Sequence, residues 1–187
     1  MRISLALVVS AILLSSTVAA GDTSKSWATT ALENFEMYCY RSGASFSRVH
    51  AMAAAFKLPQ VPSEYTPLIA GQNSTDTEAY LIQLDRDRGM AIILATGKPD
   101  ACSIYVQGLP FEQISSRFKT NYKLALAGRD DVGMQVSELY VPGGTTGGKN
   151  EARELGMIMV THPKEASGDF FVIGYMPSTT VSQLFPK

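Results

Sequence analysis

The glycine-rich segment that ends at Lys149 comes closest to a known chemical motif. It fits the G-x-x-x-x-G-K pattern of a phosphate-binding loop and reads Gly143, Gly144, Thr145, Thr146, Gly147, Gly148, Lys149. That chemistry also needs a serine or threonine after the lysine to ligate Mg²⁺, and a helix whose first amides face the phosphates. Asn150 stands at the serine or threonine position, and little more than a turn of chain precedes the next predicted strand. We therefore interpret 143–149 as a long, mobile hairpin loop that could contact a partner.

The two histidines, His50 and His162, are the available general bases. His50 is expected on the solvated side of a helix, and His162 at the end of a strand. A Ser-His-Asp site needs a nucleophile beside the histidine, and no G-x-S-x-G elbow marks any serine. Neither histidine has a partner three or four residues away for a zinc pair. We predict surface histidines, no metal site and no cofactor.

Cys39 and Cys102 are the only cysteines. An even number of cysteines in an exported chain favours a disulfide. The alternatives are a reactive thiol or a pair of metal ligands, but structural zinc sites usually show the short C-x-x-C spacing that this sequence lacks. We predict a Cys39–Cys102 disulfide, which leaves neither sulfur as a nucleophile.

The first twenty residues have the pattern of a secretory signal peptide. Arg2 precedes an apolar run over 3–14, and the small residues Val18 and Ala20 precede the predicted cut between Ala20 and Gly21. An uncleaved anchor is less favoured because a spanning helix needs about 20 apolar residues. We expect a mature chain of residues 21–187 that forms one domain, does not span the membrane and is periplasmic or secreted.

Hydrophobic periodicity predicts the order α-α-β-β-β-α-β-β-β for the elements of this domain. Helices are expected over 27–39, 47–56 and 110–122, strands over 78–84, 90–95, 102–106, 133–141, 155–162 and 170–176, and a loop over 128–131. Runs of strands separated by single helices indicate an α+β fold with a largely antiparallel sheet and helices packed on one face. The disulfide would then join the first helix pair to the third strand.

The strand that holds Met157 and Met159 is apolar on both faces, because Ile158 and Val160 alternate with the methionines. A strand covered on both sides is the favoured interpretation. An exposed methionine and aromatic face that docks a protein or an acyl chain is the alternative.

The charge balance argues against nucleic acid as a partner. Lys and Arg number 16 and Asp and Glu number 17, so the formal net charge is −1. A protein that binds by neutralising phosphates needs a basic excess or stripe. Hydrophobic residues make up 45%, which is typical of a globular chain.

Several short features resemble a loosely defined group of small, uncharacterised exported bacterial proteins. They are the Phe35-x-x-x-Cys39 helix, the 51–56 run of the second helix, and Ala101-Cys102-Ser103-Ile104 at the start of a strand. The resemblance covers about residues 30–125. It implies a periplasmic location and the disulfide, and it supplies no site residues.

Together these features favour a non-enzymatic module that binds another exported or envelope protein, of inhibitor, immunity or envelope-accessory type. Binding would use strand addition at a sheet edge or the 143–149 loop. Two alternatives stay open: an envelope-directed hydrolase with a Ser/His/Asp-type site, in which His162 is the best base, and a carrier of a small apolar ligand.

Overall fold

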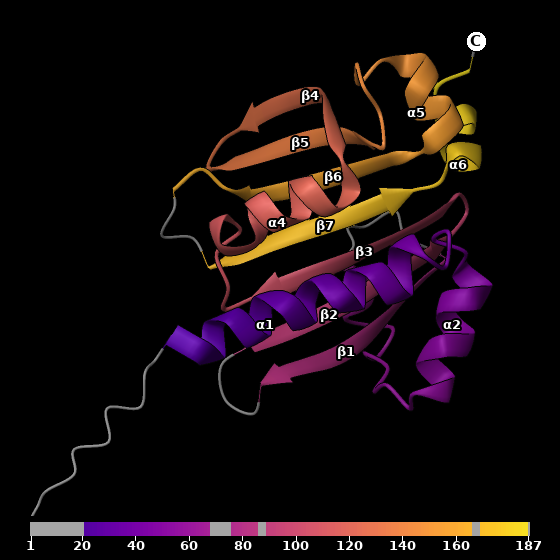
Figure 1. The fold of residues 1–187 in the computed structure, drawn as a ribbon. Helices are drawn as coiled ribbons and strands as arrows, with labels where there is room; N and C mark the ends of the chain where they lie inside the picture. Colours follow the sequence, from indigo (N-terminus) through magenta and orange to yellow (C-terminus); the bar gives the residue numbers. More distant parts are fainter. Residues whose placement is uncertain (1–20, 68–75, 86–88, 166–168, 187) are drawn as a thin grey trace, which may run out of the picture.

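In the part of the chain that the structure describes, seven antiparallel strands form one sheet in the order β1-β2-β3-β7-β6-β5-β4 (Figure 1). The computed structural model describes residues 21–67, 76–85, 89–165 and 169–186, so the predicted signal peptide over 1–20 lies outside the described residues. The strands are β1 (Thr77–Asp85), β2 (Gly89–Gly97), β3 (Asp100–Gln107), β4 (Leu124–Val132), β5 (Gln135–Pro142), β6 (Met157–Pro163) and β7 (Phe170–Met176).

Among the described residues, four helical segments cover one face of the sheet, and two short helices lie together at one end of it (Figure 1). The covering segments are α1 (Gly21–Asn34), the π-helix η1 (Phe35–Tyr40), α2 (Phe46–Ala55) and α4 (Glu112–Tyr122), and the end pair is α5 (Lys149–Leu155) and α6 (Ser178–Leu184). No helix in the described ranges has both the length and the apolarity needed to cross a membrane.

The α+β class and the predicted order of elements are confirmed, and the structure adds three elements. These are the short helices α5 and α6 and the edge strand β4, which includes the residues expected to form a loop at 128–131. Its Arg129, Asp130 and Asp131 are exposed. An edge strand has a partner on one side only, so β4 lacks the apolar alternation that reveals an inner strand.

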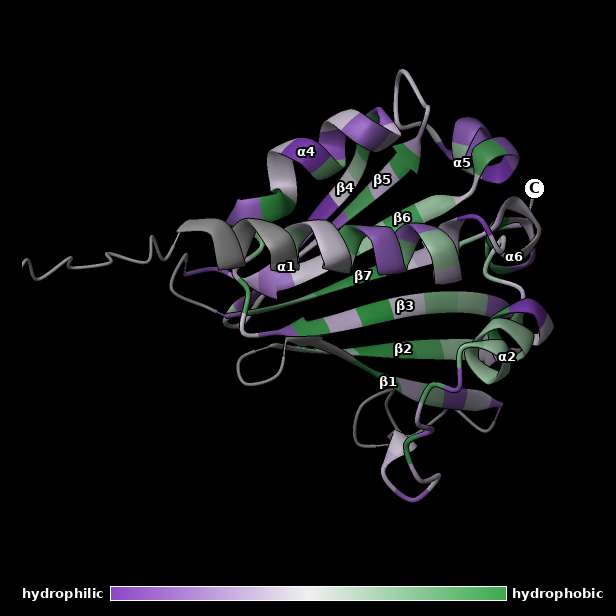
Figure 2. Ribbon diagram, turned by 60° about the horizontal axis from the view of Figure 1, so that its bottom comes forward, coloured by the Kyte–Doolittle hydropathy of each residue, from purple (hydrophilic) through white to green (hydrophobic). Residues whose placement is uncertain are grey.

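The main core lies between the sheet and its covering helices. Along β3, the buried side chains of Cys102, Ile104 and Val106 alternate with half-buried neighbours, so one face of the strand points into this core. Figure 2 shows hydrophobic segments along β2 and β3, and hydrophilic residues along much of α4. Phe35 and Phe118 are fully buried. Burial of each such side chain stabilises the fold by roughly 1.5–3 kcal/mol.

The methionine-rich strand β6 divides between core and surface. Ile158 and Val160 are fully buried beneath the helices, and Met157 is buried on the opposite face under α5 and α6. Met159 is 37% exposed, because α5 and α6 do not extend over it. The core interpretation therefore holds for three of these four side chains.

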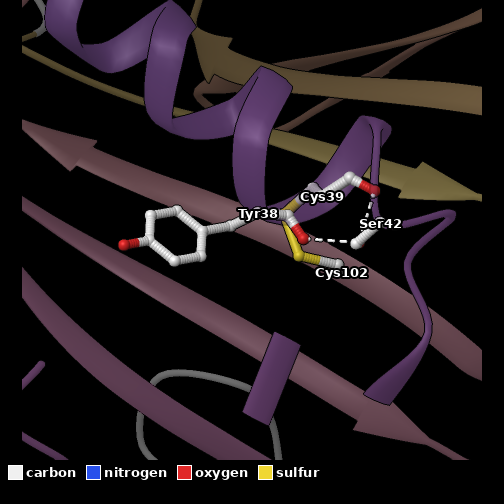
Figure 3. Close-up of a disulfide and its surroundings, with 4 residues drawn as sticks. All are labelled: Tyr38, Cys39, Ser42 and Cys102. Carbon is white, nitrogen blue, oxygen red and sulfur yellow. Dashed lines mark hydrogen bonds between the residues drawn. A yellow bond between two sulfur atoms is a disulfide. The ribbon is translucent and has the colours of Figure 1, made fainter. Parts of the chain in front are cut away.

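The predicted disulfide between Cys39 and Cys102 is present, and it joins η1 to β3 (Figure 3). Both cysteines are buried. The Ser42 hydroxyl lies 2.5 Å from the carbonyl oxygen of Tyr38 and 3.1 Å from that of Cys39, so it can donate to the last turn of η1. A buried covalent link and a capping hydroxyl therefore fix the end of η1 against the sheet.

Candidate functional site

A groove of about 1010 Å³ runs over the outer side of η1, between α2 and α4. We call this the cationic groove. Its floor consists of buried or half-buried side chains, namely Leu32, Met37, Tyr40, Met52 and Tyr122. Its rim carries the exposed cations Arg41, Arg48, Arg117 and Lys123. Two acids, Glu33 and Glu36, also line it, so positive charge exceeds negative charge at the groove although the whole chain carries −1.

The π-helical turn positions the groove residues. In η1, Phe35, Tyr38 and Cys39 are buried, whereas Glu36 and Tyr40 are half-buried and line the groove. π-Helical turns are rare and occur frequently at functional sites. The wide turn thus presents a carboxylate and a phenol beside the disulfide that fixes its position.

Glu36 is the centre of the polar network in the groove. The Tyr122 hydroxyl and the Arg41 Nε both donate to its carboxylate, the latter at 2.8 Å. Burial, followed by the hydrogen bond to Glu36, raises the pKa of Tyr122 well above its ordinary value. Burial also raises the pKa of Tyr40, and its ring centroid lies 4.9 Å from that of Tyr122. Both phenols therefore stay neutral and provide aromatic surface and hydroxyl groups, not a general base.

The other rim cations keep most of their hydrogen-bonding capacity for a ligand. Arg117 Nη1 donates to the Thr29 hydroxyl at 2.8 Å, and Arg48 Nη1 makes a long contact of 3.5 Å with the Ser42 carbonyl. Within the described ranges, the Lys123 ammonium makes no hydrogen bond or ion pair. A guanidinium carries five N–H donors in a planar fork. The rim can therefore accept carboxylates without losing its internal contacts.

The glycine-rich segment 143–149 is an ordered loop that leads into α5. The carboxylate of Glu151 accepts the backbone N–H groups of Thr145, Thr146 and Gly147 at 2.9–3.2 Å and the Thr145 hydroxyl at 2.7 Å. These donors lower the pKa of Glu151 to about 2. The loop amides that would face a phosphate are thus occupied by an internal anion. The segment leads into α5 and is therefore not a simple hairpin loop between two strands, while its mobility and its role in partner binding stay predictions.

The two histidines lie in different surroundings, His162 on β6 and His50 on α2. His162 Nδ1 lies 2.8 Å from the Pro163 carbonyl oxygen, and its ring stacks on Phe111 at 5.0 Å between centroids. His50 Nδ1 lies 2.8 Å from Glu78 Oε2 and 3.0 Å from the Tyr80 hydroxyl. In the described part of the chain, neither histidine bonds to a serine, and both cysteines are in the disulfide.

The His50, Glu78 and Tyr80 cluster and the cationic groove were both missed from the sequence. Glu78 and Tyr80 lie on β1, 28 and 30 residues after His50 of α2 in the sequence, and the four rim cations are dispersed between residues 41 and 123. The packing of α2 on the sheet brings His50 to its two partners, and the packing of α2 on the sheet and of α4 against α1 brings the rim cations together. Among the described residues, no group of three or more His, Cys, Asp or Glu side chains could hold a metal ion.

Comparison with known proteins adds no family to these observations. The chain matches no family model, no curated protein and no solved structure. The resemblance to small exported proteins therefore stays a prediction from the sequence.

Proposed function

We propose that this chain is an exported, non-enzymatic module that binds another exported or envelope protein, and that the cationic groove takes an acidic segment of that partner. The observation that carries the proposal is the concentration of four cations around an apolar floor in a chain whose net charge is −1. Interfaces commonly combine an apolar centre with a polar rim, and complementary charge speeds encounter and fixes register.

The floor and rim supply different parts of the recognition. Met37 and Met52 are half-buried and can adapt to apolar side chains of a partner, because methionine is unbranched and polarisable. Arg48 and Arg117 lie on opposite sides of η1, on α2 and α4. Each guanidinium can bind a carboxylate through two parallel hydrogen bonds. An extended acidic segment that crosses η1 would reach both.

The hydrogen bonds and pKa shifts of the ionisable groups in the groove favour a binding role over a catalytic one. Glu36 already accepts two hydrogen bonds, and the pKa values of Tyr40 and Tyr122 are raised. A general base needs a pKa near the working pH. A hydrolase would have to draw its base from the histidines, which lie outside the groove lining.

The test is affinity capture from native envelope extract with the mature chain, residues 21–187, purified with its disulfide intact. A groove variant, Arg48→Glu with Lys123→Glu, is compared with a control of equal charge change, Lys98→Glu with Lys164→Glu. We expect one dominant stoichiometric protein with the parent and the control, and its loss with the groove variant.

Cross-linking of the captured complex should place an acidic segment of the partner next to α2 and α4. Equal capture by the groove variant would refute the assignment of the groove. The absence of any partner in repeated captures would refute the binding module itself and favour the hydrolase and carrier alternatives.

A further inference from the structure

A second cavity, of about 160 Å³, lies on the opposite face of the sheet from the cationic groove. Leu139 and Met157 line it, and they alternate along their strands with Tyr140 and Ile158, which point into the main core. The helices α5 and α6 border it with Ala152 and Val181, and the pocket opens to solvent beside the exposed Phe185. We call it the α5–α6 pocket.

The size and lining of the α5–α6 pocket define the apolar part of a ligand. An apolar cavity of about 150 Å³ stays dry and binds a benzene-sized molecule. Leu139, Ala152, Met157, Val181 and Phe185 offer such a surface here. Ordinary ligand pockets of about 300–1,000 Å³ are larger, so this one suits a ring or a short alkyl chain and not a long acyl chain.

Among the described residues that line the α5–α6 pocket, Lys149 is the one charged group, and it defines the polar part of the ligand. Lys149 is exposed at the start of α5, and in the described part of the chain its ammonium makes no hydrogen bond or ion pair. The nearest acid along the helix, Glu151, is held by the loop amides. A cation beside an apolar cavity complements an anion with an apolar body.

The walls of the pocket are fixed in position. Arg153 Nε donates to the Phe185 carbonyl at 3.0 Å and its Nη2 to the Pro186 carbonyl at 2.8 Å, which ties the end of the chain to α5. On the other side, Gly147 lies so close to β4 that an added Cβ would be 2.2 Å from the Leu126 carbonyl oxygen. A site that is already ordered loses little conformational entropy on binding.

We propose that the α5–α6 pocket binds a small carboxylate with a benzene-sized apolar body, whose carboxylate pairs with Lys149. This inference is independent of the groove and of any protein partner. The chain would then have two separate sites: the cationic groove for a protein segment on one face of the sheet, and the α5–α6 pocket for a small molecule on the other.

The test is an NMR titration of the mature chain with phenylacetate, with phenylethylamine as a probe of similar body and opposite charge. We expect saturable shifts at Ala152, Val181 and Lys149 and a Kd on the order of 1 mM, which suits a ligand of this size. Phenylethylamine should bind at least about tenfold more weakly, since Lys149 repels its ammonium.

Two variants with a matched control locate the site. Ala152→Leu fills the cavity and should abolish the shifts, while Lys149→Gln should weaken phenylacetate about tenfold, the loss of one charged contact. Lys164→Gln, which removes a distant exposed lysine, should leave the Kd unchanged. Melting temperatures show whether each variant is folded. If Ala152→Leu does not fold, the Kd of Lys149→Gln for phenylacetate tests the proposal by itself. No saturable shift, equal affinity for the two probes, or an unchanged Kd in folded Lys149→Gln would each overturn the proposal.

Discussion

At the scale of single residues, the carboxylate of Glu151 determines what the glycine-rich loop can do. Three backbone N–H groups and one hydroxyl of the loop donate to it, so an internal anion takes the place that a phosphate has in loops of similar sequence. The motif in the sequence is real, because it does gather amides around an anion. Its ligand is the chain's own side chain, two residues after Lys149.

Protonation of Glu151 should release the loop as the pH falls, and replacement of Glu151 by glutamine should release it at every pH. The pKa of this carboxyl falls from 4.5 to about 2 in the folded chain, so its stabilising effect is complete above pH 4.5 and is lost as the pH falls towards 2. The protection factors of the amides of Thr145, Thr146 and Gly147 in hydrogen exchange, each taken against the intrinsic rate at the same pH, should be high at neutral pH and fall over that range. Glu151→Gln should show low protection factors at every pH, and Glu154→Gln, on the exposed side of α5, should behave as the parent. Equal protection in parent and Glu151→Gln would contradict the internal-anion assignment.

Two glycines of the same loop should respond differently to alanine. Both adopt the left-handed region, with φ of 68° at Gly143 and 67° at Gly147. An alanine at Gly143 meets open space and should cost about 1–2 kcal/mol of backbone strain. At Gly147 the new Cβ also collides with β4, so the cost should be about 3 kcal/mol or more. Urea unfolding measures both, and equal losses would show that the loop does not pack on β4.

At the scale of elements, the sequence predicts those parts of the fold whose apolar residues recur regularly. Strand β3 and helix α4 lie close to the predicted ranges, because Ile104, Val106, Ile114 and Phe118 follow the periods of a strand and a helix. The π-helical turn is not predictable in this way, since the spacing of Phe35, Tyr38 and Cys39 also fits an α-helix. The groove depends on that turn and on residues from four separate helical segments, so its geometry is set by packing alone.

The disulfide should contribute strongly to the attachment of η1. It closes a loop of 63 positions, and restriction of the unfolded chain by such a loop is worth about 4 kcal/mol. The double variant Cys39→Ala with Cys102→Ala should lose stability of this order in urea unfolding. The parent chain, unfolded in urea under reducing conditions, is the matched control, and its free energy of unfolding should equal that of the double variant. A loss below about 1 kcal/mol would mean that packing around Phe35 suffices to hold η1.

At the scale of the whole molecule, the two edges of the sheet explain why we propose partner binding at the cationic groove and not by addition of a strand. The edge strand β1 is partly covered, since Val61 donates to the Ala79 carbonyl at 2.8 Å and Leu81 to the Pro59 carbonyl at 2.9 Å. The other edge, β4, carries consecutive charges from Arg129 to Asp131, which discourage pairing with another strand. The cationic groove lies on the helix-covered face, and helical segments supply most of its lining.

Export of the chain makes a prediction that concerns the molecule as a whole. When the full chain is produced in an exporting host, N-terminal sequencing of the extracytoplasmic protein should begin at Gly21, because Val18 and Ala20 supply the small residues that the peptidase requires. Without reduction, a maleimide should label neither Cys39 nor Cys102 after denaturation. The chain started at Gly21 and kept in the cytoplasm should label at both, since disulfides rarely persist there.

An extracytoplasmic chain that begins at Met1 would instead indicate an uncleaved anchor. The two preparations also separate the contribution of the disulfide from that of the amino-acid sequence to the groove. η1 contributes both the floor residue Tyr40 and the central acid Glu36, and in the cytoplasmic form it lacks its covalent link to β3. If capture of an acidic partner requires the exported form, then the oxidising compartment does more than stabilise the fold: it completes the groove.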